Sequence, residues 1–450
     1  MENLNSQQLY RTLWRWHFYA GVFSLPFVVI LAITGAIYLF KPQLDAIHDA
    51  PYRHLLITGE FSMPEQQVAA ALAAVPHARF TDYELPRETG DAVNILLNLA
   101  GEKIRVYVHP QTLQVVNVEK EEQRFVRIVH QVHGELLMGK TGSVLVELAA
   151  CWAIVLVLTG IYLWFPRNAN GLAGVLYPRF SLKGRLFWRD LHAVIGLWIS
   201  CFVLFLLLTA LPWALVWGSA FKEVRTLTGT TAAKADWNIA GRAEPADEHA
   251  EHNHADMGFT PLPQTGTHAG TDTATSLDQI VREAQALHFA YPVLVSPPSR
   301  KSAEWTVTSD AQNRPLRADA AFDAKTGALV SRQDFSRRHI LDRIVGIGVA
   351  AHEGQLFGWI NQLLGFLTAA GLVVISVSGF LMWRKRAPDG VLGAPPAMPD
   401  AKIGAGFVAI ITITAILLPV LGASLIVVFL VEKFLVARWS RAHRWLGLEP

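Results

Sequence analysis

The stretch that decides the fold runs from Ala193 to Phe221 and reads AVIGLWISCFVLFLLLTALPWALVWGSAF. It contains no charged residue, and it exceeds the roughly 20 apolar residues with which a helix crosses the ~30 Å hydrocarbon core of a bilayer. Four further stretches meet the same length, namely Phe18–Phe40, Val144–Phe165, Gly354–Trp383 and Ile403–Val431. The sequence therefore predicts an α-helical integral membrane bundle with four core spans and a fifth hydrophobic segment.

The composition of the whole chain agrees with a membrane protein. Hydrophobic residues make up 52% of it and charged residues only 17%, whereas soluble domains carry about 25% charged residues. The net charge of +2 argues against a nucleic-acid partner. The two cysteines, Cys151 and Cys201, both lie in apolar stretches, which argues against a disulfide framework or a thiol-based redox chain.

Basic residues in the short loops predict the orientation in the membrane. They precede the first span, fill the loop between the second and third spans, and follow the fourth span, so these three segments lie on one side, predicted to be the cytoplasm. The first span has no cleavage site after it and is predicted to be a retained signal anchor. The long segments then face the periplasm of a bacterial inner membrane. A fifth crossing would place the basic tail outside, and a broken or re-entrant segment at Leu418-Pro419 would remove this conflict. The basic residues are Arg11, Arg15, Arg167, Arg179, Lys183, Arg185, Arg189, Arg384, Lys385, Arg386 and Lys402, with Arg438, Arg441 and Arg444 in the tail.

The chain contains an internal repeat. His17 is followed by Gly21 and Thr34, and His192 by Gly196 and Thr209 at the same spacings. His133 and His352 are likewise each followed at equal spacings by two glycines and a tryptophan. The offset is 175 residues for the first pair of histidines and 219 for the second, so the second copy contains about 44 additional residues.

The predicted architecture is two copies of a span, a small α+β extracytoplasmic domain and a second span. The additional residues, at about 226–275, have a composition typical of disorder. The predicted segments are 10–42 for span 1, 43–130 for the first domain, 131–167 for an outer interfacial helix and span 2, and 168–189 for a basic cytoplasmic loop. They continue with 190–221 for span 3, 222–340 for the second domain, 341–386 for an outer interfacial helix and span 4, 387–402 for a cytoplasmic loop, and 403–450 for the fifth hydrophobic segment and tail.

Four histidines occupy repeated positions near the two membrane faces. His17 and His192 begin spans one and three, and His133 and His352 precede spans two and four. Ligating side chains at membrane depth are functional candidates, and paired imidazoles can hold haem iron. Gly21 and Gly196, four residues after a histidine on the same helix face, would let a flat macrocycle approach the backbone. His130 is a candidate substitute ligand, although its counterpart in the repeat is Val349. The alternative is that these histidines are hydrogen-bonded interfacial anchors.

A second group of histidines lies in the additional residues of the second copy. His249, His252, His254 and His268 stand among carboxylates, a mixture that binds divalent metals. Without a rigid scaffold, such a loop is expected to bind a metal loosely, as a buffer or scavenger.

The chain resembles the PepSY-associated transmembrane helix family, whose members are also described as iron-regulated or iron-uptake membrane proteins. The resemblance covers roughly residues 10 to 386 and is carried by Trp14-Arg-Trp-His17, Phe187-Trp-Arg-Asp-Leu-His192, His133-Gly-Glu-Leu-Leu-Met-Gly139 and Phe322-Asp-Ala-Lys-Thr-Gly-Ala-Leu329. Some members of that family are inner-membrane ferric-siderophore reductases that bind haem. The first PepSY-like turn departs from the family pattern, with His109 and Leu113 in place of Asp and Gly, and no flavodoxin-like domain is attached.

The resemblance implies a function for the paired histidines. It predicts two haem b groups that carry electrons outward to a ferri-siderophore or other ferric chelate. The repeat suggests that His17 and His192 hold one haem and His133 and His352 the other, and cross-pairing between spans is the alternative. The electron donor would be a quinol or a cytoplasmic reductase. The rival hypotheses are a non-enzymatic PepSY protein that binds or regulates a peptidase, and a metal-handling protein. The spans lack the buried acid pairs that would favour a metal transporter.

Overall fold

A computed structural model describes residues 2–167, 171–230, 275–299, 302–387, 390–395 and 405–446. The predicted metal ligands His249, His252, His254 and His268, and most of the predicted disordered stretch 226–275, lie outside these residues.

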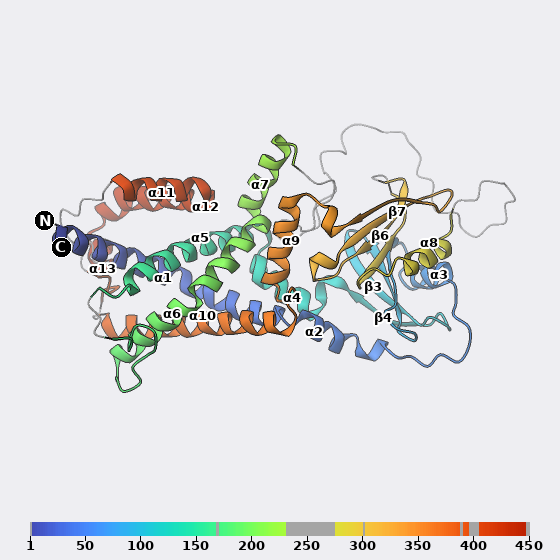
Figure 1. Ribbon diagram of the computed structural model, residues 1–450, viewed down its shortest axis with the longest axis horizontal. Coiled ribbons are helices and arrows are strands. Elements are labelled where there is room, and N and C mark those ends of the chain that lie inside the picture. Colours follow the sequence, from blue (N-terminus) through green and yellow to red (C-terminus); the bar gives the residue numbers. More distant parts are fainter. Residues whose placement is uncertain are drawn as a thin grey trace.

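Four long apolar helices form the membrane part of the molecule (Figure 1). Helix α1 packs against α5 and α10, and α6 packs against the same two helices, so the four close into a bundle. Their lengths and mean hydropathies of 2.1 to 2.6 are sufficient to cross a membrane, which agrees with the predicted helical membrane protein. The helices are α1 (Glu2–Tyr38), α5 (Gly139–Trp164), α6 (Arg185–Ala210) and α10 (Trp359–Arg386).

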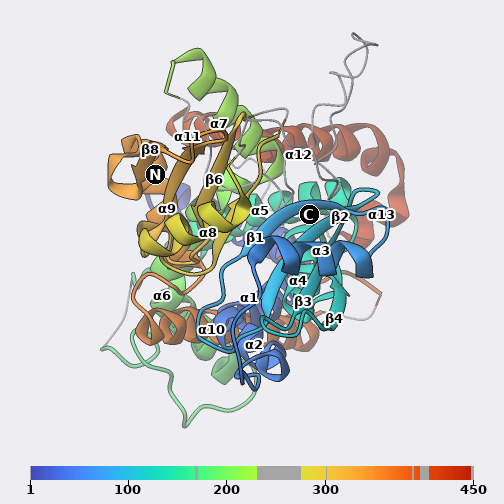
Figure 2. The same ribbon diagram turned by 90° about the vertical axis from the view of Figure 1, so that its right-hand side faces the viewer.

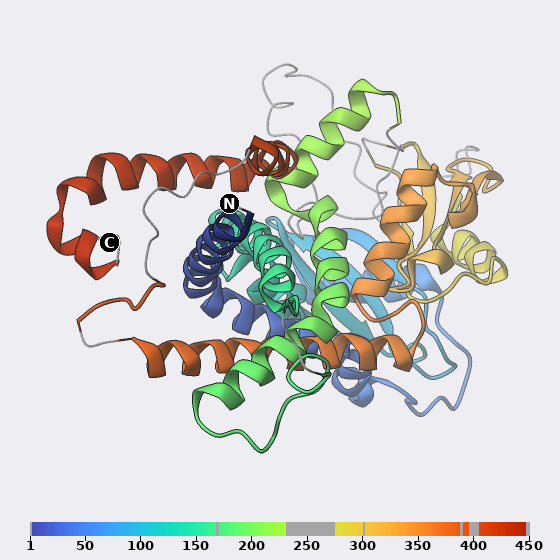
Figure 3. The ribbon, with the colours of Figure 1, turned by 60° about the vertical axis from the view of Figure 1, so that its left-hand side comes forward.

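The predicted third span is shorter than the apolar stretch that suggested it. Helix α6 is followed by the 3₁₀ turn Leu211–Trp213, and a separate helix, α7 (Leu215–Leu227), then projects sideways from the bundle (Figure 1, Figure 3). Pro212 cannot donate a backbone hydrogen bond, which favours a helix end here. Glu147 of α5 accepts hydrogen bonds from the backbone N–H groups of Val216 and Trp217, at 2.8 and 3.0 Å. It thereby satisfies donors that the first turn of α7 leaves without helical partners.

The fifth hydrophobic segment is a broken pair of helices rather than one span. Helix α11 (Ala405–Leu417) ends before Leu418, and α12 (Pro419–Leu430) begins at the proline and packs against α11, α5 and α7. At the break, the indole N–H of Trp217 donates to the Leu417 carbonyl at 3.0 Å.

The chain then returns to the end of the bundle from which it started. The last helix, α13 (Ser440–Trp445), follows a π-helical turn (Val431–Leu435) and a 3₁₀ turn (Val436–Arg438). The Tyr19 hydroxyl of α1 donates to the Leu446 carbonyl at 2.6 Å, and the Leu392 N–H donates to the Trp445 carbonyl at 2.8 Å. The tail helix α13 therefore lies beside the N-terminal half of α1, at the left of the bundle in Figure 1. We call this the basic end of the bundle, defined by Arg15, Arg167, Arg189, Arg384 and Lys385, and the opposite end the sheet end.

Beyond the sheet end, the two predicted α+β units share one sheet. All eight strands are antiparallel, in the order β4-β3-β2-β1-β5-β6-β7-β8, and the two halves join where Tyr83 of β1 pairs with Val295 of β5. The strands are β1 (Arg79–Glu84), β2 (Val93–Leu99), β3 (Glu102–Val108), β4 (Val115–Lys120), β5 (Val293–Ser296), β6 (Glu304–Ser309), β7 (Ala318–Asp323) and β8 (Leu329–Asp334).

Two helices cover the face of the sheet that is turned away from the bundle (Figure 2). Helices α3 (Pro64–Ala74) and α8 (Leu277–Ala286) bury Ala71 and Ile280 against Ile95, Val295 and Val307 in one apolar core. Between the sheet and the bundle lie α2 (Lys41–His48), α4 (Phe125–Glu135) and α9 (Ile340–His352). Helices α4 and α9 carry the two histidines of the sheet end.

Candidate functional site

His17 of α1 is held by helix α5 at the basic end. Its Nδ1 lies 2.9 Å from the hydroxyl oxygen of Thr159, and that hydroxyl donates its own proton to the Val155 carbonyl at 2.7 Å. The hydroxyl can therefore only accept from the imidazole, so the proton of His17 is on Nδ1. A Cβ added at Gly160 would lie 3.3 Å from the ring, so the close approach of α5 to the imidazole requires a small residue there.

His192 of α6 is held by helix α10 in a corresponding way. Its Nδ1–H donates to the Ile375 carbonyl at 2.8 Å, with the Ser378 hydroxyl at 3.3 Å. Because a carbonyl can only accept, the proton of this ring is also on Nδ1. Gly379 lies against the ring, where a Cβ would come within 3.4 Å. Ser378 and Gly379 follow Thr159 and Gly160 by 219 residues.

The two imidazoles of the basic end face each other across the bundle. Their ring centres are 6.4 Å apart and their planes are at 87°. Two imidazoles on opposite sides of one metal ion would have ring centres about 6.4 Å apart, because a metal–nitrogen bond is about 2 Å long and the ring centre lies roughly 1.2 Å beyond the nitrogen. At this separation, His17 and His192 would be able to bind one metal ion between them.

The sheet end has a similar arrangement, but its histidines are on α4 and α9 rather than on the membrane-length helices. His133 of α4 lies with Nδ1 3.0 Å from the Thr34 hydroxyl of α1, and His352 of α9 lies with Nδ1 3.0 Å from the Thr209 hydroxyl of α6. Both hydroxyls donate to carbonyls of their own helices, at 2.7 and 2.8 Å, so both rings carry their proton on Nδ1. A Cβ at Gly35 would lie 3.1 Å from His133.

These two rings lie outside the four membrane-length helices, and both residues are partly buried. Burial lowers the pKa of His133 to about 3, with a further contribution from nearby His352, and burial lowers the pKa of His352 to about 4. Both imidazoles are therefore neutral at pH 7, which is the form that binds a metal. The Trp213 ring packs edge-on against His352, with centres 5.3 Å apart.

In all four histidines, Nε2 is thus the ring nitrogen without a proton. In the part of the chain that the structure describes, no Nε2 of these four has a hydrogen-bond partner. A ligating histidine characteristically donates its other ring N–H to a fixed acceptor, which sets the tautomer and ring orientation. Neutral imidazoles held in this way are the donor type that haem iron takes.

The two imidazole pairs are separated along the bundle axis. His17 and Thr34, the partner of His133, are both on α1 and 17 residues apart, which corresponds to about 25 Å at 1.5 Å per residue. This separation is comparable to the ~30 Å thickness of a hydrocarbon core.

Comparison with protein families identifies the chain. The model of the PepSY-associated TM region matches residues 14–386 and so includes all four imidazoles. The chain belongs to the PepSY-associated TM region family. No curated protein matches it.

Some residues of this PepSY-associated protein were predicted in other roles. Gly21, predicted to lie against a macrocycle, has Leu156 3.8 Å from where its Cβ would be, and Gly196 faces open space. The packing of Gly21 and Gly196 against a macrocycle stays a prediction. The glycines that contact the imidazoles are Gly35, Gly160 and Gly379. The internal repeat had included Gly160, Gly379, Thr34 and Thr209. Their spacing did not show that they contact the imidazole rings.

His130 is beside the sheet-end pair but does not share its arrangement. Its ring lies 5.3 Å from that of Tyr38, at 46°. Burial and the neighbouring Arg127 lower its pKa to about 4. The described residues include no hydroxyl or carbonyl that holds this ring as the other four are held.

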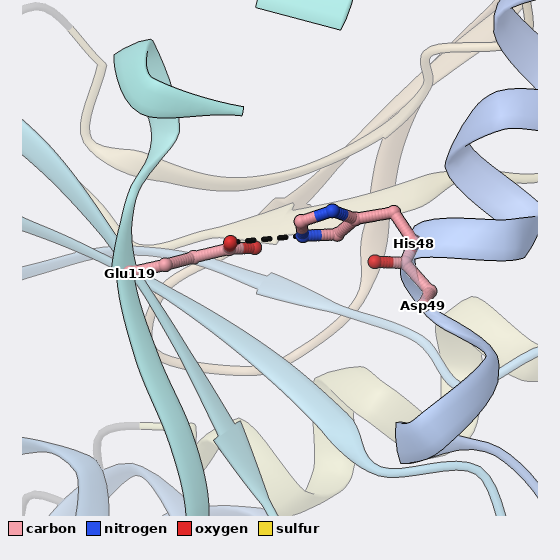
Figure 4. A group of neighbouring side chains, drawn as sticks. All are labelled: His48, Asp49 and Glu119. Carbon is pink, nitrogen blue, oxygen red and sulfur yellow. Dashed lines mark hydrogen bonds and ion pairs between the residues drawn. The ribbon is translucent and has the colours of Figure 1, made fainter. Parts of the chain in front are cut away.

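One further cluster has ligand types suited to a metal. His48, Asp49 and Glu119 bring ligand atoms within 4.8 Å of one another (Figure 4). The Nε2 of His48 already bonds Glu119 at 2.9 Å, and the guanidinium of Arg124 bonds both carboxylates, at 2.7 and 2.9 Å. Because the Arg124 guanidinium already bonds both carboxylates, these contacts join α2, β4 and α4 in the PepSY-associated protein.

Proposed function

We propose that this protein is a haem-containing electron-transfer protein of the bacterial inner membrane that reduces a ferric substrate, a ferri-siderophore or other ferric chelate, on the periplasmic side. The observation that carries the proposal is the pair of facing imidazoles His17 and His192, with ring centres 6.4 Å apart and both protons held on Nδ1. The corresponding hydrogen bonds of His133 and His352 support a second haem b at the sheet end. When bound, each haem supplies a one-electron Fe(III)/Fe(II) couple.

The protein's own groups position the four imidazoles. The Thr and Ser hydroxyls and the Ile375 carbonyl fix the imidazole planes, and the small residues beside the rings let the helices approach. The basic end, with its excess of Arg and Lys, is proposed to be cytoplasmic. A quinol or a cytoplasmic reductase would supply electrons there. The sheet then lies in the periplasm beside the second imidazole pair, where it can receive a ferric chelate.

Reduction of Fe(III) to Fe(II) is a suitable chemistry for releasing iron from such a chelate. Siderophores hold ferric iron through hard oxygen ligands, and the softer ferrous ion binds these more weakly. The two halves of the sheet are proposed to be two PepSY-like domains. They would flank the sheet-end imidazole pair, where electrons leave the protein.

The test is a single-turnover reduction. Haem-loaded protein in detergent, reduced with dithionite and freed of excess reductant, is mixed with a ferric hydroxamate chelate in the presence of a ferrous-specific chromophore. We expect the haem to reoxidise and ferrous iron to appear in a ratio of one iron per electron. Protein that contains haem but stays reduced would contradict the ferric substrate, and protein that binds no haem would favour the regulatory PepSY hypothesis.

A second prediction concerns the hydroxyls that hold the rings. Thr209→Val removes the acceptor of His352 with almost no change in shape, and loss of such a partner typically weakens metal binding 10- to 100-fold. We expect haem affinity at the sheet end to fall by this amount, measured by transfer of haem to apomyoglobin. The matched control is Thr412→Val, since Thr412 makes the same bond to its own helix, at 2.9 Å, and contacts no histidine. Equal haem loss in both variants would contradict the role of Thr209.

A further inference from the structure

The connection between β6 and β7 differs from its counterpart in the other half of the sheet. Strands β2 and β3 are joined by residues 100 and 101, a tight hairpin turn with φ values of 52° and 90°. Strands β6 and β7 are joined by residues 310–317, which include the 3₁₀ turn η6 (Arg314–Leu316). Loops that exceed the length needed for closure often carry function.

This longer loop packs against the helix that carries His352. The Arg314 guanidinium donates through Nη1 to the Glu353 carboxylate at 2.7 Å, and both side chains are more than nine-tenths buried. Glu353 directly follows His352. The loop therefore contacts the residue next to His352. The two-residue turn of the other half is too short to make an equivalent contact.

Three consecutive side chains in this loop each have a buried polar atom without a hydrogen-bond partner. They are Gln312 Nε2, Asn313 Oδ1 and Arg314 Nε. An unsatisfied buried polar group costs about 1–3 kcal/mol, and native proteins contain few of them. Three in succession single out this loop as a candidate binding segment.

The chemistry of these atoms specifies the ligand. The Gln312 amide can present its nitrogen as a donor, and Arg314 Nε is a donor. Arg314 uses Nη1 for Glu353, which leaves the Nε side of the guanidinium fork. That side suits the two oxygens of a carboxylate. The Asn313 amide can present either its oxygen or its nitrogen, because the two are assigned from their partners.

We infer that Gln312, Asn313 and Arg314 form a carboxylate-binding site beside the sheet-end imidazole pair. The carboxylate has two chemical sources: a propionate of haem held by His133 and His352, or a carboxylate of the ferric chelate that receives the electron. The inference deepens the proposed function, and it rests on that function for the identity of both sources.

The test introduces a repelling charge with little change in shape. Gln312→Glu places a carboxylate where the site has a donor. The matched control is Gln333→Glu, the same substitution on the exposed edge strand β8. Arg314→Lys is the second variant, because it keeps a cation for Glu353 but removes Nε.

Two measurements separate the sources. If the ligand is a propionate, Gln312→Glu lowers the midpoint potential of one haem in a redox titration by about 60 mV, the equivalent of a tenfold change for a one-electron couple. If it is the chelate, the potentials stay the same and binding of radiolabelled ferric citrate weakens at least tenfold. Arg314→Lys is expected to act in the same direction.

The inference is overturned if neither the haem potentials nor ferric citrate binding differs between the two Gln variants and the unmodified protein. Failure of the proposed function would be distinct, since it appears as unmodified protein without haem. Ferric citrate binding by that haem-free protein, with and without Gln312→Glu, would still test the site.

Discussion

His192→Ala is expected to remove one of two low-spin haem signals from the purified protein. The substitution deletes one of the two facing imidazoles at the basic end, while His133 and His352 stay about 25 Å away along the bundle. The remaining ligand, His17, can hold haem iron from one side only, so that haem is either lost or five-coordinate and high-spin. The low-spin absorbance per chain should fall by about half.

A histidine substitution at the sheet end is expected to have the same effect on the absorbance. His352→Ala should also halve the low-spin absorbance, and the double variant should have none. His54→Ala is the control, because His54 is an exposed histidine near the sheet, 72% accessible in its side chain. Unchanged spectra in either single variant, measured as oxidised-minus-reduced difference spectra on equal protein, would refute the assignment of that ligand.

Arg225→Ala is expected to destabilise the protein by about 3–5 kcal/mol, the usual cost of removing one partner of a buried ion pair. Arg225 of α7 makes two bonds to Asp342 of α9, at 2.7 and 3.1 Å, and both side chains are almost fully buried. The loss would leave the Asp342 charge without its guanidinium partner. Because α9 ends at His352, the same variant should also lower haem occupancy at the sheet end.

The measurement is the free energy of unfolding in mixed detergent–SDS titrations. Lys120→Ala breaks the exposed pair Lys120–Glu102, whose side chains are 47% and 56% accessible, and it should cost no more than about 1 kcal/mol. The double variant Arg225→Met, Asp342→Leu should regain at least half of the lost stability. Equal effects of Arg225→Ala and Lys120→Ala would show that the buried pair does not stabilise the fold.

The sequence was sufficient for the features that depend on local composition and spacing. Apolar length predicted the four bundle helices, and equal spacing singled out His17, His133, His192 and His352. The proline in Leu418-Pro419 marked the break between α11 and α12. The side of the tail followed only from contacts such as Tyr19 with Leu446, which join residues at opposite ends of the chain.

Long-range pairings were beyond the sequence pattern. Nothing in the strand residues indicated that Tyr83 would pair with Val295 and join two units into one sheet. The partners of the imidazoles were equally hidden, because a threonine in an apolar helix normally bonds its own backbone. Thr34, Thr159 and Thr209 do so and also accept from a histidine. The Arg314–Glu353 pair depends on the longer β6–β7 loop folding against α9, which spacing does not show.

The central claim is that facing imidazoles bind haem iron, and low-temperature EPR of the oxidised protein tests it most directly. Perpendicular axial imidazole planes give a highly anisotropic low-spin ferric signal, whereas parallel planes give an ordinary rhombic one. With the His17 and His192 planes at 87°, we predict the highly anisotropic signal, and we predict that His192→Ala abolishes that component. Folded protein, produced with ample haem, that shows no low-spin ferric signal would contradict the account.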